Sequence, residues 1–261
     1  LVEPIYRSVF GAALHLAMFE AEDEPRRVAQ LRTKGFLADR LPKLDPADTV
    51  IDLGSGYGDT ARYLAQHFGC RVIGINLVHS QNVRSLSFSQ EAGLGNKIFA
   101  VEADFARVPL PSACTRVVWS QEALLHAPNR QRVLNEAARL LYAGGTFIFT
   151  DLLQTGPMSQ AEAQGLYERV KIDAFETFES YRQQLQAAGL LVTEVEDLSH
   201  YVAHSYANHI EEIEQARSRL DNVVDPEYID YTIEAMGRWV TAARKGQLGW
   251  GLFVASKMVP A

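Results

Sequence analysis

The stretch Val50-Ile-Asp-Leu-Gly-Ser-Gly-Tyr-Gly-Asp59 runs from apolar residues straight into three glycines at alternate positions, and a helical pattern follows over residues 60–68. Glycine lets a strand turn sharply into a helix and lets a ligand approach the backbone closely. The amide groups at the start of the helix then face that ligand. The stretch therefore predicts a strand, a ligand-binding turn and a helix, in that order.

The glycine spacing argues against two common nucleotide-binding turns. A dinucleotide-binding turn needs its third glycine at position 59, which is Asp59 here, and an acidic residue about 20 positions further on, where this chain has Asn76. A nucleoside-triphosphate loop needs Lys followed by Ser or Thr after the glycines, and this stretch lacks them. Because Asp52 would repel a pyrophosphate, we expect a ligand with a cationic or zwitterionic group at this turn.

Strand and helix signals alternate through most of the chain. The expected strands are the short apolar runs at residues 49–53, 71–75, 98–101, 116–120, 146–151, 190–195 and 250–257. The expected helices are residues 60–68, 80–92, 129–141, 159–174 and 178–188, with Gly144-Gly145 as the stop signal after the third of them. This order predicts a doubly wound α/β fold with a mostly parallel seven-stranded sheet, whose last strand is antiparallel.

Composition narrows the class of protein. The 25 basic and 32 acidic side chains leave a net charge of −7, which argues against a nucleic-acid partner. No apolar stretch approaches the roughly 20 residues that span a bilayer, so we expect no membrane segment. Cys70 and Cys114 lie outside any metal-ligand spacing, which predicts free thiols, no metal site and a cytoplasmic location.

Four stretches together resemble the class I S-adenosylmethionine-dependent methyltransferases. Residues 50–58 resemble motif I, and Glu102-Ala-Asp104-Phe105 resembles the strand-three segment of that superfamily. Two more stretches resemble the strand-four segment and the turn before strand five, namely Val117-Val-Trp-Ser-Gln-Glu-Ala-Leu-Leu-His126 and Arg139-Leu-Leu-Tyr-Ala-Gly-Gly-Thr146. Over residues 10–200 the wording is most similar to the glycine/sarcosine/dimethylglycine N-methyltransferases of glycine betaine synthesis.

The resemblance implies a single methyltransferase domain over residues 1–261. Its Rossmann-like core would comprise residues 45–199 and 247–261, with an N-terminal helical cap at 1–44 and a helical insertion at 200–246. S-adenosylmethionine would be the cofactor. The residues expected to bind it are Asp52, Gly54, Ser55, Gly56, Gly58, Asn76, Leu77, Gln81, Asp104, Phe105, Trp119 and Gln121.

Individual roles follow from the same resemblance. Asp104 would bind the adenine amine, and Asn76 would meet the ribose hydroxyls in place of the usual acid. His126 and Glu122 are the candidate catalytic residues, because an amine acceptor must lose a proton before it attacks. The small-molecule acceptor would be bound by Tyr6, His15, Tyr57, Arg169, Tyr206 and Trp250, with Arg169 holding its carboxylate.

Three departures from the family pattern leave the acceptor open. Ala17, Lys171 and Ser205 stand where the resemblance has Gly, His and His. We expect N-methylation of an amine of the sarcosine or dimethylglycine type, with a natural-product O-, C- or S-methyltransferase as the alternative. Two other classes are an NAD-dependent oxidoreductase, which Asp59 and Asn76 disfavour, and a protein that binds S-adenosylmethionine without turnover. A homodimer is an option that the sequence leaves open.

Overall fold

The structure is a computed structural model that describes Ile5, Val9, Gly11 and residues 15–259. The chain divides into two compact units. The sheet unit comprises Lys34–Asp151, Phe178–Glu196 and Gly251–Ala261, and the helical unit comprises Leu1–Thr33, Leu152–Thr177 and Asp197–Trp250.

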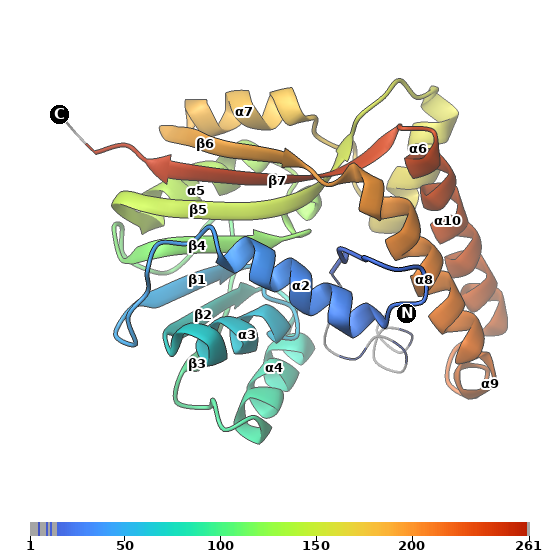
Figure 1. Cartoon of the computed structure of the whole chain (residues 1–261), viewed down its shortest axis with the longest axis horizontal. Helices are drawn as coiled ribbons and strands as arrows, with labels where there is room; N and C mark the ends of the chain where they lie inside the picture. Colours follow the sequence, from blue (N-terminus) through green and yellow to red (C-terminus); the bar gives the residue numbers. More distant parts are fainter. Residues whose placement is uncertain (1–4, 6–8, 10, 12–14, 260–261) are drawn as a thin grey trace. The chain divides into compact units, whose positions relative to one another are not determined.

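A seven-stranded sheet with the strand order β3-β2-β1-β4-β5-β7-β6 confirms the predicted fold class (Figure 1). The pairs β1–β2, β2–β3, β1–β4 and β4–β5 are parallel, while β7 runs opposite to β6. The strands are β1 (Thr49–Leu53), β2 (Arg71–Asn76), β3 (Ile98–Glu102), β4 (Thr115–Gln121), β5 (Leu141–Gln154), β6 (Leu190–Asp197) and β7 (Leu248–Lys257). The middle strands β1 and β4 are buried almost throughout, as expected when helices cover both faces of a parallel sheet.

Aromatic packing joins β5, β7 and α7 (Phe178–Ala187) in the sheet unit. The ring of Phe149 stacks on those of Phe147 and Phe253 at centroid distances of 4.9 and 4.8 Å. Tyr181 of α7 meets Phe149 edge-on at 5.1 Å, and its hydroxyl donates a hydrogen bond to Asp151. Burying this hydroxyl costs little because the carboxylate accepts its hydrogen bond. The other helices of this unit are α3 (Asp59–Phe68), α4 (His79–Glu91) and α5 (Arg130–Leu140).

The turn between β1 and α3 depends on glycine at two positions. Gly54 and Gly58 have φ angles of 79° and 69°, in the left-handed region that side chains disfavour. A Cβ atom at Gly54 would collide with the side chain of Ala123, and one at Gly58 with the hydroxyl of Ser85. The amide of Gly54 donates to the carbonyl of Ile75 at 2.8 Å, which ties the turn to the end of β2. The expected strand, turn and helix are therefore confirmed.

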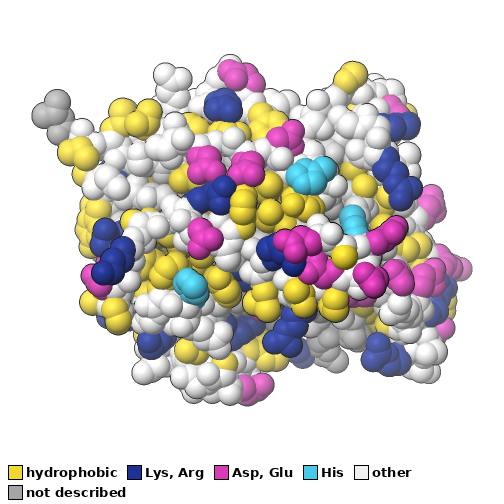
Figure 2. All heavy atoms as spheres, viewed as in Figure 1, with side chains coloured by type: hydrophobic (Ala, Val, Ile, Leu, Met, Phe, Trp, Pro, Cys, Tyr) yellow, Lys and Arg dark blue, Asp and Glu magenta, His cyan; other side chains and the backbone are white. Residues whose placement is uncertain are grey.

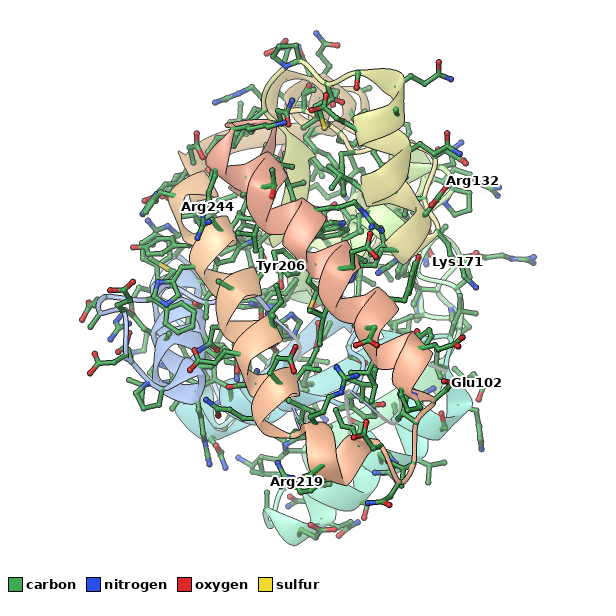
Figure 3. The ribbon with its side chains drawn as sticks, turned by 90° about the vertical axis from the view of Figure 1, so that its right-hand side faces the viewer. Glu102, Arg132, Lys171, Tyr206, Arg219 and Arg244 are labelled. Carbon is green, nitrogen blue, oxygen red and sulfur yellow. The ribbon has the colours of Figure 1, made fainter. Side chains whose placement is uncertain are left out.

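Three helices dominate the helical unit, and α10 (Pro226–Arg244) packs against both α6 (Gln160–Val170) and α8 (Val202–Gln215), as Figure 3 shows. Helix α6 begins with a capping box in which Ser159 and Glu162 each bond the other's backbone amide. Helix α10 begins at Pro226 behind an Asp225 cap. With the short α9 (Arg217–Leu220), these elements confirm the predicted helical segment at 200–246.

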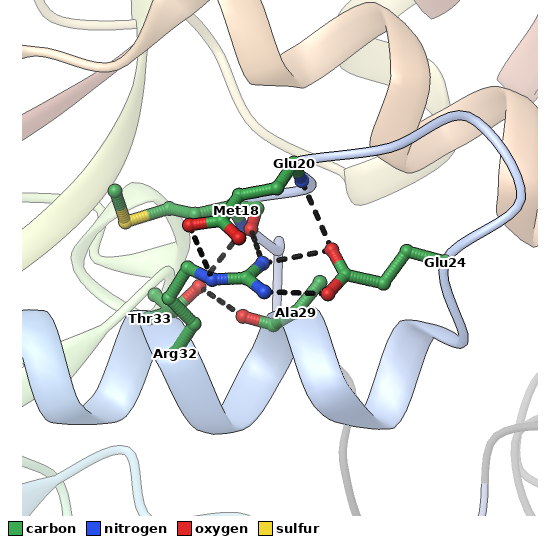
Figure 4. Close-up of polar contacts among 6 residues, drawn as sticks. All are labelled: Met18, Glu20, Glu24, Ala29, Arg32 and Thr33. Carbon is green, nitrogen blue, oxygen red and sulfur yellow. Dashed lines mark hydrogen bonds and ion pairs between the residues drawn. The ribbon is translucent and has the colours of Figure 1, made fainter.

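The N-terminal part is less helical than predicted, because residues 15–25 contain no helix and α2 spans Arg26–Ala38. Side chains of α2 hold this segment instead (Figure 4). The Arg32 guanidinium donates to the Met18 carbonyl at 2.6 Å and pairs with the carboxylates of Glu20 and Glu24. Its hydrogen bond holds the pKa of Glu24 at about 2. On the face of the molecule drawn in Figure 2, acidic and basic side chains lie next to one another.

The predicted stop signal Gly144-Gly145 is also wrong, because the preceding helix ends at Leu140 and both glycines lie inside β5. Thr115 of β4 pairs with Leu141, whereas Val117, two residues later, pairs with Thr146. An advance of two residues along β4 thus corresponds to an advance of five residues along β5. The glycines form this bulge rather than a helix end.

Replacing Gly58 by Ala should destabilise the fold more than replacing Gly93 by Ala. Both glycines have nearly the same φ angle, 69° and 71°, so each substitution carries a backbone cost of about 1–2 kcal/mol. A Cβ atom at Gly93 meets no other atom of residues 15–259 within 4 Å, whereas one at Gly58 meets Ser85. Urea unfolding of the two variants measures the difference. Equal free energies of unfolding would contradict the packing argument.

Candidate functional site

The predicted cofactor residues meet at the carboxyl ends of β2, β1 and β4. Asp52 of β1 is level with Gly74 of β2 and Trp119 of β4, so the segments after these positions leave the sheet at one edge. This edge is where ligands bind in open α/β sheets. Gly56 has open space on its outer side, because a Cβ atom there would meet no other atom of the described residues within 4 Å.

Asn76 at the end of β2 is fixed by the start of α4. Its Nδ2 donates to the side-chain oxygens of Gln81 and Asn82 at 3.1 and 3.3 Å. Because the amide nitrogen faces α4, the amide oxygen faces away from it. The neighbouring Leu77 is 62% exposed, which is high for a leucine and leaves its side chain available to a ligand.

The segment after β3 carries the next predicted pair. Asp104 is exposed and its Oδ1 accepts the Ala106 amide at 2.8 Å, which forms a local turn. The ring of Phe105 approaches the glycine turn, since its Cε1 lies 3.8 Å from the position of a Cβ atom at Gly54. The structure therefore brings Phe105 to the same turn as the predicted cofactor residues of β1.

Gln121 ends β4 and is 4% exposed. Its Oε1 accepts hydrogen bonds from the Thr60 hydroxyl at 2.7 Å and from the Trp119 indole at 3.2 Å. The Trp119 ring is fully buried, so it belongs to the core of the sheet unit while its N–H reaches a predicted site residue. Thr60 at the start of α3 was missed by the sequence prediction, because no motif distinguishes a buried threonine there.

The two candidate catalytic residues follow β4. Glu122 has a φ angle of 41°, a costly conformation for a residue with a side chain, and such strain often accompanies functional sites. Thr150 of β5 holds it twice: the Thr150 carbonyl accepts the Glu122 amide at 2.9 Å, and the Thr150 hydroxyl donates to the Glu122 carboxylate at 2.6 Å. His126 ends the short helix η2 (Leu124–His126) and is exposed.

In the helical unit, Arg169 lies against two aromatic rings. Its guanidinium carbon is 4.9 Å from the centroid of the Trp239 ring and 5.7 Å from that of Tyr206. The Trp239 indole donates to the Leu166 carbonyl of α6, the helix that carries Arg169, at 3.2 Å. Tyr206 lies between α8 and α10 in Figure 3 and meets Trp239 edge-on at 5.0 Å. Sequence reasoning missed Trp239, although it is fully buried in α10.

A buried histidine lies on the same side of α8 as Tyr206. The two rings are 5.8 Å apart, and burial lowers the pKa of His209 to about 3, helped by the positive charges of Arg26 and Arg169. Arg26 in turn pairs with Glu212 at 2.9 Å. His209 and Arg26 were not among the predicted site residues, although the i, i+3 spacing of His209 from the predicted Tyr206 places both on one side of a helix.

The remaining predicted acceptor residues are spread out. His15 is partly exposed and its carbonyl accepts the Gln30 side chain at 2.7 Å. Trp250 is fully buried beside Tyr201, and Tyr57 belongs to the sheet unit, where it is buried in the glycine turn. Tyr6 lies outside the described residues. Lys171 ends α6 in an exposed position.

The described residues contain neither a cluster of metal ligands nor a membrane-spanning helix. Across Ile5, Val9, Gly11 and residues 15–259, no group of three or more Cys, His, Asp or Glu side chains is arranged to hold a metal ion. In the same part of the chain, no helix has the length and apolar character needed to cross a membrane.

Residues 51–149 match the model of a family described as a methyltransferase domain. A sarcosine/dimethylglycine N-methyltransferase of Halorhodospira halochloris is 34% identical over 95% of this chain and 88% of its own length. The chain belongs to this methyltransferase family. It is therefore a methyltransferase that uses S-adenosylmethionine and acts on a small molecule.

Two further similarities bear on this family membership. The crystal structure of a putative sarcosine dimethylglycine methyltransferase from Galdieria sulphuraria superposes with a TM-score of 0.93 at 26% identity, covering 99% of this chain and 97% of that one. A 27-O-demethylrifamycin SV methyltransferase of Amycolatopsis mediterranei is 29% identical over 95% of this chain and 91% of its own length. The methyltransferase therefore has relatives with different kinds of acceptor.

Replacing His209 by Gln should weaken the pH dependence of stability between pH 7 and pH 5. The pKa of His209 falls to about 3 in the folded state, whereas an unfolded histidine titrates near 6.5. As the pH drops below about 6.5, the unfolded chain binds a proton that the folded chain does not, so this residue removes about 2 kcal/mol of stability by pH 5. Urea unfolding at both pH values measures this. If wild type and variant lost the same free energy of unfolding between pH 7 and pH 5, the assigned role of His209 would be contradicted.

Proposed function

We propose that the methyltransferase N-methylates an amine of the sarcosine or dimethylglycine type. The observation that carries this proposal is Arg169, whose guanidinium lies against the rings of Trp239 and Tyr206. A planar guanidinium binds a carboxylate through two parallel hydrogen bonds, and an amino acid offers that carboxylate next to its amine. The sarcosine/dimethylglycine N-methyltransferase of Halorhodospira halochloris, which is 34% identical to this chain, supports the same acceptor class.

The residues at the glycine turn fit S-adenosylmethionine. This cofactor carries a methyl group on a positively charged sulfur, which makes the methyl reactive toward an amine. The open side of Gly56 gives room for a ligand against the backbone, and the first backbone amides of α3 point toward the N-terminal end of that helix. The Asn76 oxygen, turned away from α4, can accept a ribose hydroxyl as an acid would. Ser55, Leu77 and Gln81 belong to the same proposed site.

Phe105 supports the proposed adenine end of this site. A ring beside the glycine turn offers a flat apolar face on which an adenine can pack. Asp104 precedes it and is exposed, so its carboxylate can accept the adenine amine. Asp52, buried at the end of β1, places a negative charge toward the methionine end, where the cofactor is cationic.

His126 is the proposed general base, with Glu122 as the alternative. An imidazole titrates near neutral pH and suits the removal of a proton from an ammonium. Glu122 already accepts a hydrogen bond from Thr150, which favours a positioning role for its carboxylate. For the acceptor itself we propose Arg169 and Tyr206, with His15, Tyr57 and Trp250 as the further predicted contacts.

The other expectations remain proposals. The free thiols of Cys70 and Cys114 agree with a cytoplasmic location. The net charge of −7 agrees with the absence of a nucleic-acid partner. A single methyltransferase domain is also proposed. A homodimer is proposed on the sequence alone. The natural-product O-, C- or S-methyltransferase is the second candidate function, which the Amycolatopsis mediterranei relative and the departures at Ala17, Lys171 and Ser205 favour.

The test is turnover of S-adenosylmethionine by the purified protein against a panel of acceptors, read by mass spectrometry. Sarcosine and dimethylglycine should each gain one methyl group per cycle. The panel also contains hydroxyl-bearing aromatic and polyketide acceptors. Product from these acceptors, with none from sarcosine or dimethylglycine, would replace the first proposal by the second.

Replacing Arg169 by Lys should raise the KM for dimethylglycine about 10-fold to 100-fold, because a lysine cannot make the paired hydrogen bonds to a carboxylate. The matched control is Arg238→Lys, an arginine of α10 whose side chain bonds Glu234 and the Gly165 carbonyl. Steady-state kinetics with saturating S-adenosylmethionine measures both variants. An unchanged KM in Arg169→Lys would exclude this residue from acceptor binding.

Replacing His126 by Gln should lower kcat by about 100-fold to 10,000-fold, the usual contribution of a general base. Glu122→Gln is the matched control and should lower kcat less, because Thr150 can still bond the amide. Single-turnover rates across pH 6–9 distinguish the two, since loss of the base also removes the acidic limb of the rate profile. The reverse order of effects would assign the base to Glu122.

A further inference from the structure

The amide of Gln121 is held in one orientation. Its Oε1 accepts hydrogen bonds from the Thr60 hydroxyl at 2.7 Å and the Trp119 indole at 3.2 Å. An indole N–H can only donate, so the side-chain oxygen of Gln121 must face Trp119. The amide nitrogen therefore faces the opposite side, and rotating the amide would bring two donors together.

In this orientation the amide nitrogen of Gln121 requires a hydrogen-bond acceptor from another source. Among the described residues, Nε2 of Gln121 has no hydrogen-bond partner, although the atom is buried. A buried donor without an acceptor is costly and rare in folded proteins. Because the side chain is 96% buried and rigidly held, a bound ligand is the natural source of the acceptor atom.

The position of Gln121 tells which end of the ligand is near. It ends β4, whereas Asn76 ends β2, and β1 with its glycine turn lies between these two strands. Thr60 is the second residue of α3, directly after that turn. The two amides thus lie on opposite sides of the glycine turn. If Asn76 meets the ribose, Gln121 is on the side of the amino-acid end of the cofactor.

We propose that Thr60 and Trp119 are positioning residues that aim the Gln121 amide donors at the carboxylate of S-adenosylmethionine. At the amino-acid end, the cofactor has an ammonium, a sulfonium and a carboxylate, and only the carboxylate accepts hydrogen bonds. Trp119 thereby acts through its N–H rather than by stacking on the cofactor. This inference rests on the proposed binding of the cofactor at the glycine turn.

The experiment compares two ligands by calorimetry: S-adenosylhomocysteine and its analogue that lacks the carboxylate. The quantity measured is the dissociation constant of the analogue divided by that of S-adenosylhomocysteine. Thr60→Val keeps the shape of the side chain but removes the hydroxyl, and should lower the ratio about 10-fold by weakening the carboxylate-bearing ligand alone. Thr60→Ser keeps the hydroxyl and should retain the wild-type ratio. Gln121→Leu should lower the ratio at least as much as Thr60→Val.

Three outcomes would overturn the inference. In the first, Thr60→Val weakens both ligands equally, which marks a general structural role. In the second, the ratio is unchanged in Thr60→Val and Gln121→Leu. In the third, the only change is a higher KM for dimethylglycine, which assigns the amide to the carboxylate of the acceptor. If the wild-type protein binds neither ligand, the proposed cofactor site itself fails. Thermal unfolding of each variant shows that it is folded.

Discussion

The close fit of the glycine turn against its neighbours is the constraint on which the rest of the site depends. Gly54 and Gly58 adopt left-handed conformations and leave no space for a side chain beside Ala123 and Ser85. Gly56, between them, has no described atom within 4 Å of the place where a side chain would begin. Two glycines thus serve packing, and the third leaves the backbone accessible. Helix α3 starts where it does because the turn ends at Gly58, which brings Thr60 to Gln121.

Buried amides continue from this turn on both sides. Asn76 is fixed through its nitrogen by α4, and Gln121 through its oxygen by Thr60 and Trp119. The two side chains therefore present opposite groups, an acceptor at β2 and a donor at β4. A ligand with hydroxyls at one end and a carboxylate at the other complements this pattern. Such complementarity fixes the direction of binding more strongly than the glycines could alone.

Local sequence patterns predicted the sheet and the turn because both depend on short-range signals. Short apolar runs marked the strands, three glycines marked the end of β1, and the parallel order then brought Asp52, Asn76 and Gln121 to one edge. The same patterns failed where long-range contacts decide. Arg32 holds residues 15–25 out of a helix, and a bulge in β5 absorbs two glycines that look like a helix stop. Trp239 and His209 were missed because their burial near Arg169, and not a sequence motif, connects them with the predicted site.

The most direct test of the account is the affinity of Gly56→Ala for S-adenosylhomocysteine, with Gly93→Ala as the reference. Within the part of the chain that the structure describes, neither added methyl group meets another atom within 4 Å, and both glycines have positive φ angles of 51° and 71°. The two variants should therefore lose similar stability. Only Gly56→Ala should bind the ligand about 10-fold or more weakly, because its methyl group enters the space of the cofactor. Wild-type affinity in Gly56→Ala would contradict the claim that the cofactor binds against this turn.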